Sequence, residues 1–322
     1  MTRRHVAFFI ARRLVVLLLL LVFVSFAIFS LQYIAPGSVI DILLGTNLRT
    51  PATVAALRHQ YHLDKSFFVQ YWIWLKDAFF HFKFGNSIQS TLPVTYEIKS
   101  RLPTSLFLGL YAYVLTMVLG VGFGILAALR KWSLADRGIV ATSIVGLSTP
   151  AFVSGVFLLY IFAVELPWFP VFGSGDWFVD QLWHLTLPAF ALAFVAAAYV
   201  LKHTRAAMIG VLDQDYVTFA RARGLSSRRV LYLYALRNAL IPVVTISGLI
   251  LAFVITGAVL VEVTFSVQGI GWLLVQSATT KDLPVLQGVG LVVATTIMVA
   301  NLLADLVYLA VDPRIRFGGG RA

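Results

Sequence analysis

The chain has 322 residues, of which 60% are hydrophobic and only 12% are charged, and its formal net charge is +11. Soluble domains are about 45–50% apolar and about 25% charged, so this composition excludes an ordinary soluble protein and indicates an integral membrane protein. Cysteine is absent, which excludes disulfides, thiol catalysis and cysteine-ligated metal sites.

Six apolar stretches reach the roughly 20 residues that a helix needs to cross about 30 Å of hydrocarbon. They predict an all-α membrane protein with six transmembrane helices, at residues 9–34, 104–129, 138–164, 184–204, 239–264 and 285–311. The first stretch follows four arginines, but it is longer than the apolar core of a signal peptide and no A-x-A pattern follows it. We therefore expect an uncleaved signal anchor.

Basic residues are concentrated in four of the segments outside these stretches. The N-terminus, residues 130–137, residues 202–237 and the C-terminus together hold 17 Lys/Arg and 4 acidic residues, whereas the remaining loops hold eight of each. The positive-inside rule then places both termini in the cytoplasm. The basic excess marks membrane topology, and no nucleic-acid partner is expected.

The segment 35–103 is expected on the extracytoplasmic side, as a folded cap or as interfacial helices packed on the membrane with a turn at Gly85-Asn86. Direct contact with the substrate is the alternative. His59 and His62 are spaced for one helix face, but a metal site needs more ligands than two, so none is expected. A later outer segment with Gly269 and Gly271 predicts a short re-entrant or surface helix.

The expected organisation has four parts. Residues 1–34 form the cytoplasmic N-terminus and first transmembrane helix, and residues 35–103 form the extracytoplasmic cap segment. Residues 104–311 form the transmembrane core, which includes a cytoplasmic loop at 205–238, and residues 312–322 form a cytoplasmic tail.

Sequence patterns for catalysis or nucleotide binding are absent from the chain. No G-x-x-x-x-G-K-[ST], H-E-x-x-H or G-x-S-x-G pattern occurs, so we expect neither an ATP site nor an enzymatic activity. Glu262 and Asp305 are the only acidic residues within the predicted spans, which leaves open an ion-coupled secondary transporter. Because both lie toward span ends, structural pairing is the favoured interpretation.

Small and polar residues cluster within several predicted spans. Helix packing is the favoured role for such residues, and lining of a translocation tunnel is the alternative. The possible pathway residues are Ser148, Thr149, Ser154, Thr245, Thr256 and Asn301. Gly120 and Gly124, four residues apart, predict a face for close helix packing.

The loop between the fourth and fifth spans contains the stretch DYVTFARARGLSSRRV, which starts at Asp215. Asp213 or Asp215 is expected to cap a short helix that ends at Ala222. Gly224 fits the left-handed position that terminates a helix. This order predicts a helix with a sharp end.

A second helix is expected to start at Ser226 or Ser227, with the hydroxyl capping its first turn, and to run toward Asn238 and Pro242. Two helices with a tight joint would form a rigid elbow that projects from the membrane. A solvated basic loop beside anionic lipid would also explain five arginines, but it does not explain the order of cap, glycine and cap.

The stretch DYVTFARARGLSSRRVLYLYALRNALIPVV resembles the cytoplasmic loop of ABC importer permeases of the peptide/nickel subfamily. Three further stretches match that family in order: YHLDKSFFVQYWIWL…FGNS, VEVTFSVQGIGWLLVQS at 261–277 and DPRIRFG at 312–318. The general motif of these permeases has Glu-Ala-Ala where this chain has Thr218, Phe219 and Ala220, and the glycine is retained as Gly224.

The resemblance implies a type I ABC importer permease architecture with a cytoplasmic coupling helix that docks in a groove of an ATP-hydrolysing subunit. It assigns ATPase coupling to Asp215, Tyr216, Thr218, Phe219, Ala220, Arg221, Ala222, Arg223, Gly224 and Leu225. Its departure from Glu-Ala-Ala leaves the docking role in place but removes the expectation of one particular acidic contact.

The resemblance further implies a bacterial inner (plasma) membrane location and a set of partners. These are a second homologous permease, two ABC ATPases that bind ATP and Mg²⁺, and an extracytoplasmic substrate-binding protein, with no cofactor in this chain. Di- or oligopeptides are the expected substrate, and nickel, glutathione or another small solute is the alternative. No His-, Met- or Cys-rich pathway for a soft metal is present, which favours peptides.

Overall fold

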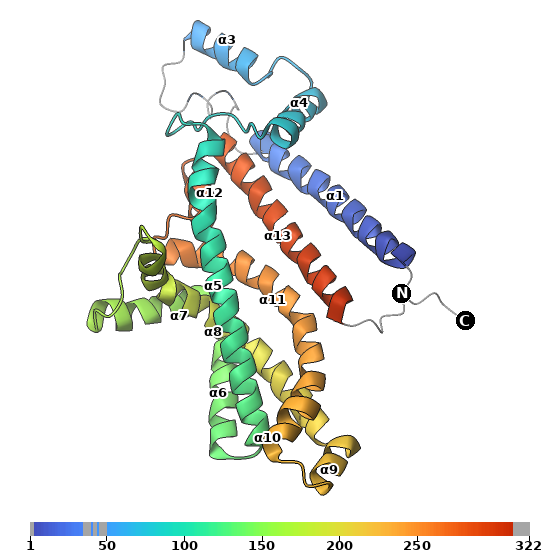
Figure 1. Ribbon diagram of the computed structural model, residues 1–322. Coiled ribbons are helices and arrows are strands. Elements are labelled where there is room, and N and C mark those ends of the chain that lie inside the picture. The colour runs from blue at the N-terminus through green and yellow to red at the C-terminus, as the bar shows by residue number, and fades with distance from the viewer. Residues whose placement is uncertain (1–2, 35–39, 41–43, 45–49, 312–322) are drawn as a thin grey trace. The chain divides into compact units, whose positions relative to one another are not determined.

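The computed structural model describes residues 3–34, 40, 44 and 50–311, and within these ranges the chain is mostly helical and has no strand, with a single isolated β-bridge between Asn86 and Pro93 (Figure 1). The predicted tail 312–322, with its DPRIRFG motif, lies outside the described residues. The helices are α1 (Arg3–Ile34), α3 (Pro51–Gln60), α4 (Phe67–His81), α5 (Val94–Leu129), α6 (Leu134–Ser148), α7 (Ala151–Leu159), η1 (Tyr160–Glu165), α8 (Phe178–Leu212), α9 (Asp215–Ala222), α10 (Ser227–Arg229), η2 (Val230–Leu236), α11 (Arg237–Thr264), α12 (Ile270–Thr279) and α13 (Leu283–Val311).

Five helices of the described chain are long and apolar enough to cross a membrane, and a bent helix pair brings the number to six. The all-α fold with six predicted spans is therefore confirmed. Several helices extend beyond the apolar stretches that predicted them. α5 begins at Val94 rather than near residue 104 and carries Pro103 inside it, and α8 runs from Phe178 to Leu212 rather than over 184–204.

The third predicted span, 138–164, is wrong as one straight helix. α6 and the α7–η1 segment meet at an angle of 108°. Thr149, at the break, has extended φ and ψ of −107° and 122°, and Pro150 follows it. Proline disfavours helical geometry in the residue before it and has no N–H for the helical hydrogen-bond ladder, so the helix stops and restarts here.

The chain forms two compact units. The first consists of Met1–Ser105 with Gln268–Met298, and the second of Leu106–Val267 with Val299–Ala322, so that α5 and α13 contribute residues to both. In the first unit, Phe84, Val94, Ile98, Leu273 and Val289 are among the buried side chains that join the start of α5 to α12 and α13.

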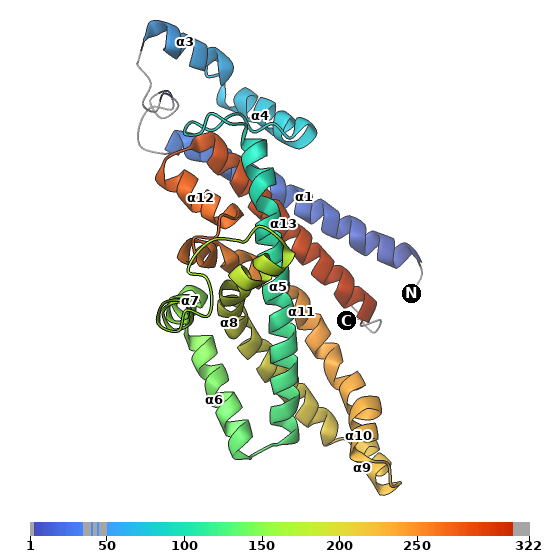
Figure 2. The same cartoon turned by 60° about the vertical axis from the view of Figure 1, so that its left-hand side comes forward.

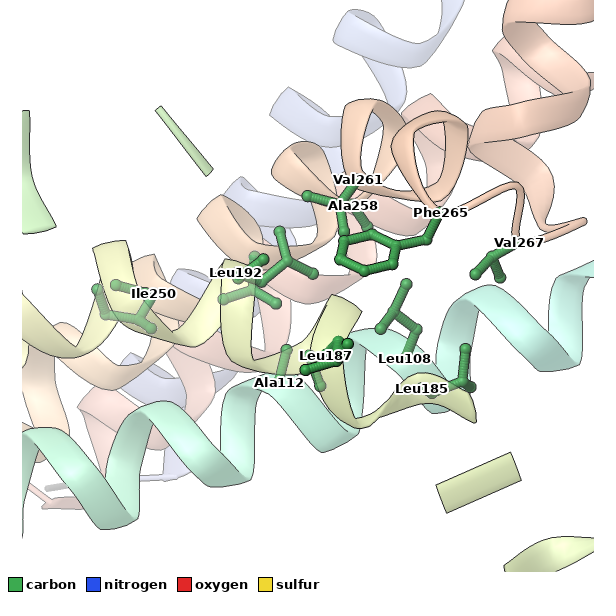
Figure 3. Close-up of a cluster of buried hydrophobic side chains, with 14 of the residues drawn as sticks. Leu108, Ala112, Leu185, Leu187, Leu192, Ile250, Ala258, Val261, Phe265 and Val267 are labelled. Atoms are coloured by element: carbon green, nitrogen blue, oxygen red, sulfur yellow. The ribbon is translucent and has the colours of Figure 1, made fainter. Parts of the chain in front are cut away.

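The second unit is built around α8, whose buried face consists mainly of alanine and leucine. Figure 3 shows its core, in which Leu187 and Leu192 of α8 lie near Ala112 of α5 and near Val261 and Phe265 at the end of α11. The alanines keep this face of α8 flat, so that other helices can approach its backbone closely.

Two glycines of α5 allow such an approach to α8, which confirms the predicted packing face. A Cβ added at Gly120 would lie 2.6 Å from Cβ of Val200, and one at Gly124 would lie 2.6 Å from Cβ of Thr204. Real Cβ atoms do not come this close, so both positions require glycine for the observed distance between the two helices.

Candidate functional site

The predicted elbow lies at one end of the second unit, where α8 ends and α9 begins (Figures 1 and 2). α9 spans Asp215–Ala222, as expected, with Asp215 in its first turn, where a negative charge stabilises the helix dipole. The expected side-chain cap is wrong. Gln214 is the N-cap residue and makes no capping hydrogen bond, and its side-chain amide nitrogen donates to the carbonyl of Gly210 in α8.

A small apolar cluster holds α9 against the helices on either side of it. Val217 and Ala220 of α9 and Val230 at the start of η2 are buried, with relative exposures of 0%, 4% and 2%. Leu212 and Tyr234 pack against them. Burial of these side chains is the main term that keeps a helix of eight residues folded, because so short a helix is marginal by itself.

The end of α9 has the geometry of a Schellman motif. The N–H of Gly224 donates to the carbonyl of Arg221 at 2.9 Å, and the N–H of Leu225 donates to that of Ala220 at 3.3 Å. Gly224 has φ of +77°, which confirms the predicted left-handed position. A Cβ at this glycine would meet no atom within 4 Å, so glycine is required here by backbone conformation alone.

The second helix of the elbow differs from its prediction in two respects. Ser226 precedes it with extended geometry, but its hydroxyl makes no capping bond. The helix also extends past Asn238 and Pro242, the residues toward which it was expected to run. It continues as one 38-residue apolar helix, Ser227–Thr264, with a π-helical segment at Val230–Leu236. Pro242 lies inside this helix, and membrane helices tolerate an internal proline when the freed carbonyls find other partners.

A side chain of this long helix also reaches α9. The amide nitrogen of Asn238 donates to the Tyr216 hydroxyl at 3.3 Å and to the Tyr234 carbonyl at 2.9 Å. This bond and the apolar cluster fix α9 to the first turns of the transmembrane helix that follows it.

The predicted coupling residues fall into two groups. Ala220 is buried and Leu225 is half-buried, so both serve the internal packing of the elbow. The others are exposed and form one surface at the end of the unit, with Phe219 68% exposed: Asp215, Tyr216, Thr218, Phe219, Arg221, Ala222, Arg223 and Gly224. This surface combines an aromatic side chain with arginines and is available to a partner.

An ion pair that the sequence does not reveal lies near the elbow. Nε and Nη2 of Arg205, on α8, donate to the two carboxylate oxygens of Asp136, on α6, at 2.7 and 2.8 Å. The Asp136 side chain is only 3% exposed, and it also accepts the N–H of Trp132 at 2.9 Å. The sequence offers Asp136 only as one acidic residue of a basic loop, and its partner is 69 residues away.

A second, exposed ion pair runs along the same turn. Nζ of Lys131 lies 3.6 Å from a carboxylate oxygen of Asp213, the residue that caps the end of α8. The start of α6 therefore contacts α8 at Arg205 through Asp136, and Lys131 of the turn before it contacts Asp213, the C-cap residue of α8. This places the turn in mechanical contact with the base of the elbow.

The possible pathway residues all lie in the second unit but on different elements. Ser148 ends α6, Thr149 occupies the break, Ser154 lies on α7, and Thr245 and Thr256 lie on α11, with Asn301 on α13. The hydroxyls of Thr149, Thr245 and Thr256 donate to carbonyls four residues earlier in the chain, at 2.9–3.1 Å. Their hydrogen-bonding needs are thus met within the helices, which favours the packing interpretation for these three.

The two acidic residues within spans have different environments. Glu262 is 1% exposed and lies two residues before the end of α11. Asp305 is half-buried on α13.

In the outer segment, His62 lies beyond the end of α3 with φ of +53°, so it is not on one helix face with His59. Among the described residues, no three His, Cys, Asp or Glu side chains are grouped to hold a metal.

Family models and curated relatives match this sequence over nearly its whole length. Residues 120–317 match the family model "Binding-protein-dependent transport system inner membrane component", and residues 6–109 match the model of the corresponding N-terminal region. The oligopeptide transport system permease protein AppB of Bacillus subtilis (strain 168) is 37% identical over 317 residues, which cover 97% of this chain and all of that protein. The di/tripeptide transport system permease protein DppB of Pseudomonas aeruginosa (strain UCBPP-PA14) is 36% identical over 331 residues, or 96% of this chain and 98% of that one.

Two solved structures share the fold. A chain of the MetNI methionine ABC transporter has a TM-score of 0.56 at 15% identity and covers 67% of this chain and 97% of its own. A chain of an amino acid ABC transporter has a TM-score of 0.51 at 19% identity, with coverages of 67% and 94%. These likenesses confirm the predicted ABC importer permease architecture. The chain is a multi-pass membrane protein, and it belongs to the family of inner membrane components of binding-protein-dependent transport systems.

Proposed function

We propose that this chain is the permease subunit of an ATP-driven importer and forms half of the translocation pathway for di- or oligopeptides. Relatives with 36–37% identity over nearly the full length of both chains carry oligopeptide or di/tripeptide permease names, which supports the peptide class. Nickel, glutathione or another small solute is the alternative within the same family.

The elbow is the observation that carries the coupling role. α9 is held by the buried apolar cluster of Val217, Ala220 and Val230, and it ends in a Schellman motif at Gly224. Its exposed surface carries Phe219 beside arginines. A helix held in this way transmits a push from a partner to α8 and α11 rather than bending locally. In our proposal Phe219 enters a groove of the ATPase, and Arg221 and Arg223 pair with acidic residues at the rim of that groove.

The other functions of the importer, which are ATP hydrolysis, substrate delivery and the second half of the pathway, are assigned to partner subunits. A second homologous permease completes the pathway, two ABC ATPases bind ATP and Mg²⁺, and an extracytoplasmic protein delivers the substrate. Both termini lie in the cytoplasm, as the distribution of basic residues predicts. ATP closes the ATPase pair, the coupling helices move together, and the spans open toward the opposite side of the membrane.

Affinity purification of the tagged chain from its native membrane in mild detergent tests this proposal. Mass spectrometry identifies the partners, and ATPase activity is measured with dipeptides, longer peptides and Ni²⁺ in the presence of any co-purified binding protein. Recovery of two kinds of partner, ATPases and a second permease, with hydrolysis stimulated by peptides, is the expected result. Stimulation by Ni²⁺ alone would reject the peptide substrate but keep the importer.

The ion-coupled alternative, in which Glu262 and Asp305 carry protons or sodium, is separated by an uptake assay in proteoliposomes. Uptake that requires internal ATP and survives a protonophore supports the importer. Uptake that persists without ATP and stops when the ion gradient is removed would contradict our proposal and identify a secondary transporter.

A further inference from the structure

One face of α4 is packed firmly against α1. The Phe29 ring of α1 lies 5.5 Å from the Phe67 ring, 5.6 Å from the Tyr71 ring and 5.5 Å from the Trp74 ring, measured between centroids. The Tyr71 hydroxyl lies 2.8 Å from Oγ of Ser25. Figures 1 and 2 both show α4 beside the C-terminal part of α1.

These contacts fix the depth of α4 relative to the membrane. The apolar stretch of α1 runs from Ile10 to Ile34, and α4 contacts it from Tyr33 back to Val22, whose carbonyl lies 3.1 Å from the Tyr71 hydroxyl. At 1.5 Å per residue, Val22 is about 18 Å from the end of this stretch. Because one leaflet of hydrocarbon is about 15 Å thick, the residues of α1 that α4 contacts are level with the acyl chains when the apolar stretch of α1 spans the membrane.

The opposite face of α4 is apolar and exposed. Phe68, Trp72 and Phe80 have 71%, 65% and 78% of their surface exposed. Lys76 and Asp77 are the charged residues between them. The long Lys76 side chain can extend to the membrane surface while its methylene groups remain in an apolar environment, and the half-exposed Asp77 carboxylate lies 3.3 Å from Nδ1 of His81. A row of large aromatic side chains facing water would be exceptional for a helix so well packed on its other side.

The exposed face of α4 also lies at the same depth as the lipid-facing surface of α1. In α1, Leu19 and Phe23 are 62% and 69% exposed, as expected of a helix that faces lipid. The exposed aromatic face of α4 continues this apolar surface at the level of its contacts with α1.

We propose that α4 is embedded in the membrane leaflet around the C-terminal half of α1, with Phe68, Trp72 and Phe80 against lipid acyl chains. The helix is thus a membrane-inserted wedge rather than part of a cap in the aqueous phase. This proposal does not depend on the substrate or on ATP coupling, because it rests only on contacts within the first unit.

Site-directed spin labelling tests the proposal directly, because the chain has no cysteine to remove. Single variants Phe68→Cys and Phe80→Cys are labelled with a nitroxide, and the purified assembly is reconstituted into phospholipid vesicles. Leu19→Cys on α1 is the matched control for lipid, and Asp64→Cys, in the exposed turn before α4, is the control for water. Collision rates with oxygen, which partitions into lipid, and with a water-soluble nickel chelate are measured by power saturation.

The expected result is that labels at positions 68 and 80 collide several-fold more with oxygen than with the nickel chelate, as at Leu19. Nickel accessibility equal to that at Asp64 would place the face in water and overturn the proposal. Low accessibility to both reagents would show that another protein covers the face, and it would also overturn it. Because both substituted side chains are largely exposed, loss of folding is not expected, and it is checked by the co-purification of partners.

Discussion

Replacement of Asp136 by asparagine is expected to destabilise the second unit by about 2–3 kcal/mol. The change keeps the size of the side chain but removes the charge that Nε and Nη2 of Arg205 contact. Breaking a buried ion pair by removing one partner typically costs about 3–5 kcal/mol, because the other charge stays buried without compensation. The Arg205 side chain is 25% exposed, so it retains some contact with water and the expected cost falls below that range.

The reverse change, Arg205→Gln, is expected to cost more, about 3–5 kcal/mol, because the carboxylate left behind is only 3% exposed. The double variant is expected to cost less than the sum of the two single changes, by about 1–3 kcal/mol, as for residues in direct contact. Lys131→Gln is the matched control. It breaks the pair with Asp213, in which both side chains are more than a third exposed, so its expected effect is below about 1 kcal/mol.

Unfolding of the purified chain in mixed micelles, followed by tryptophan fluorescence against denaturant, measures these differences. Additive effects of the Asp136 and Arg205 changes, or a shift for Asp136→Asn no larger than that for Lys131→Gln, would refute the reasoning. Peptide uptake by the same variants then shows whether the Asp136–Arg205 ion pair is also needed to couple motion of the elbow to α6.

Further predictions concern two glycines. Gly224→Val is expected to leave membrane insertion intact but to lower uptake per ATP hydrolysed, because a β-branched residue disfavours φ of +77°. Gly224→Asn should retain most of the coupling, since asparagine tolerates this conformation, and normal coupling in the valine variant would remove the helix-end role. Gly124→Val should destabilise the unit by about 1–3 kcal/mol through overpacking against α8. Gly122→Val, where a Cβ meets nothing within 4 Å, is its control, and equal unfolding midpoints would contradict the packing role.

The sequence predicted most of the elbow because its signals are local. A left-handed glycine, a helix of two turns and an acidic first turn all depend on residues within a few positions of one another. The capping hydroxyl at Ser226 was wrong, and the continuation of the second helix past Pro242 was not predicted, because both depend on the surroundings. Inside a membrane helix, a proline is tolerated when neighbouring carbonyls find other partners, and Pro103, Pro188 and Pro242 all lie within continuous helices.

Hydropathy and length by themselves determined the membrane class, the all-α fold and the number of spans, because the bilayer imposes its thickness on every helix that crosses it. Only the tertiary structure decided where a helix breaks. Pro150 ends α6, whereas three other prolines do not end theirs, and the two helices on either side of this break pack separately on α8, where Gly146 of α6 lies against Ala198 and Gly155 of α7 against Ala191. The tertiary structure also decided that Asp136 is a buried partner of Arg205, since packing brings these side chains together across 69 residues.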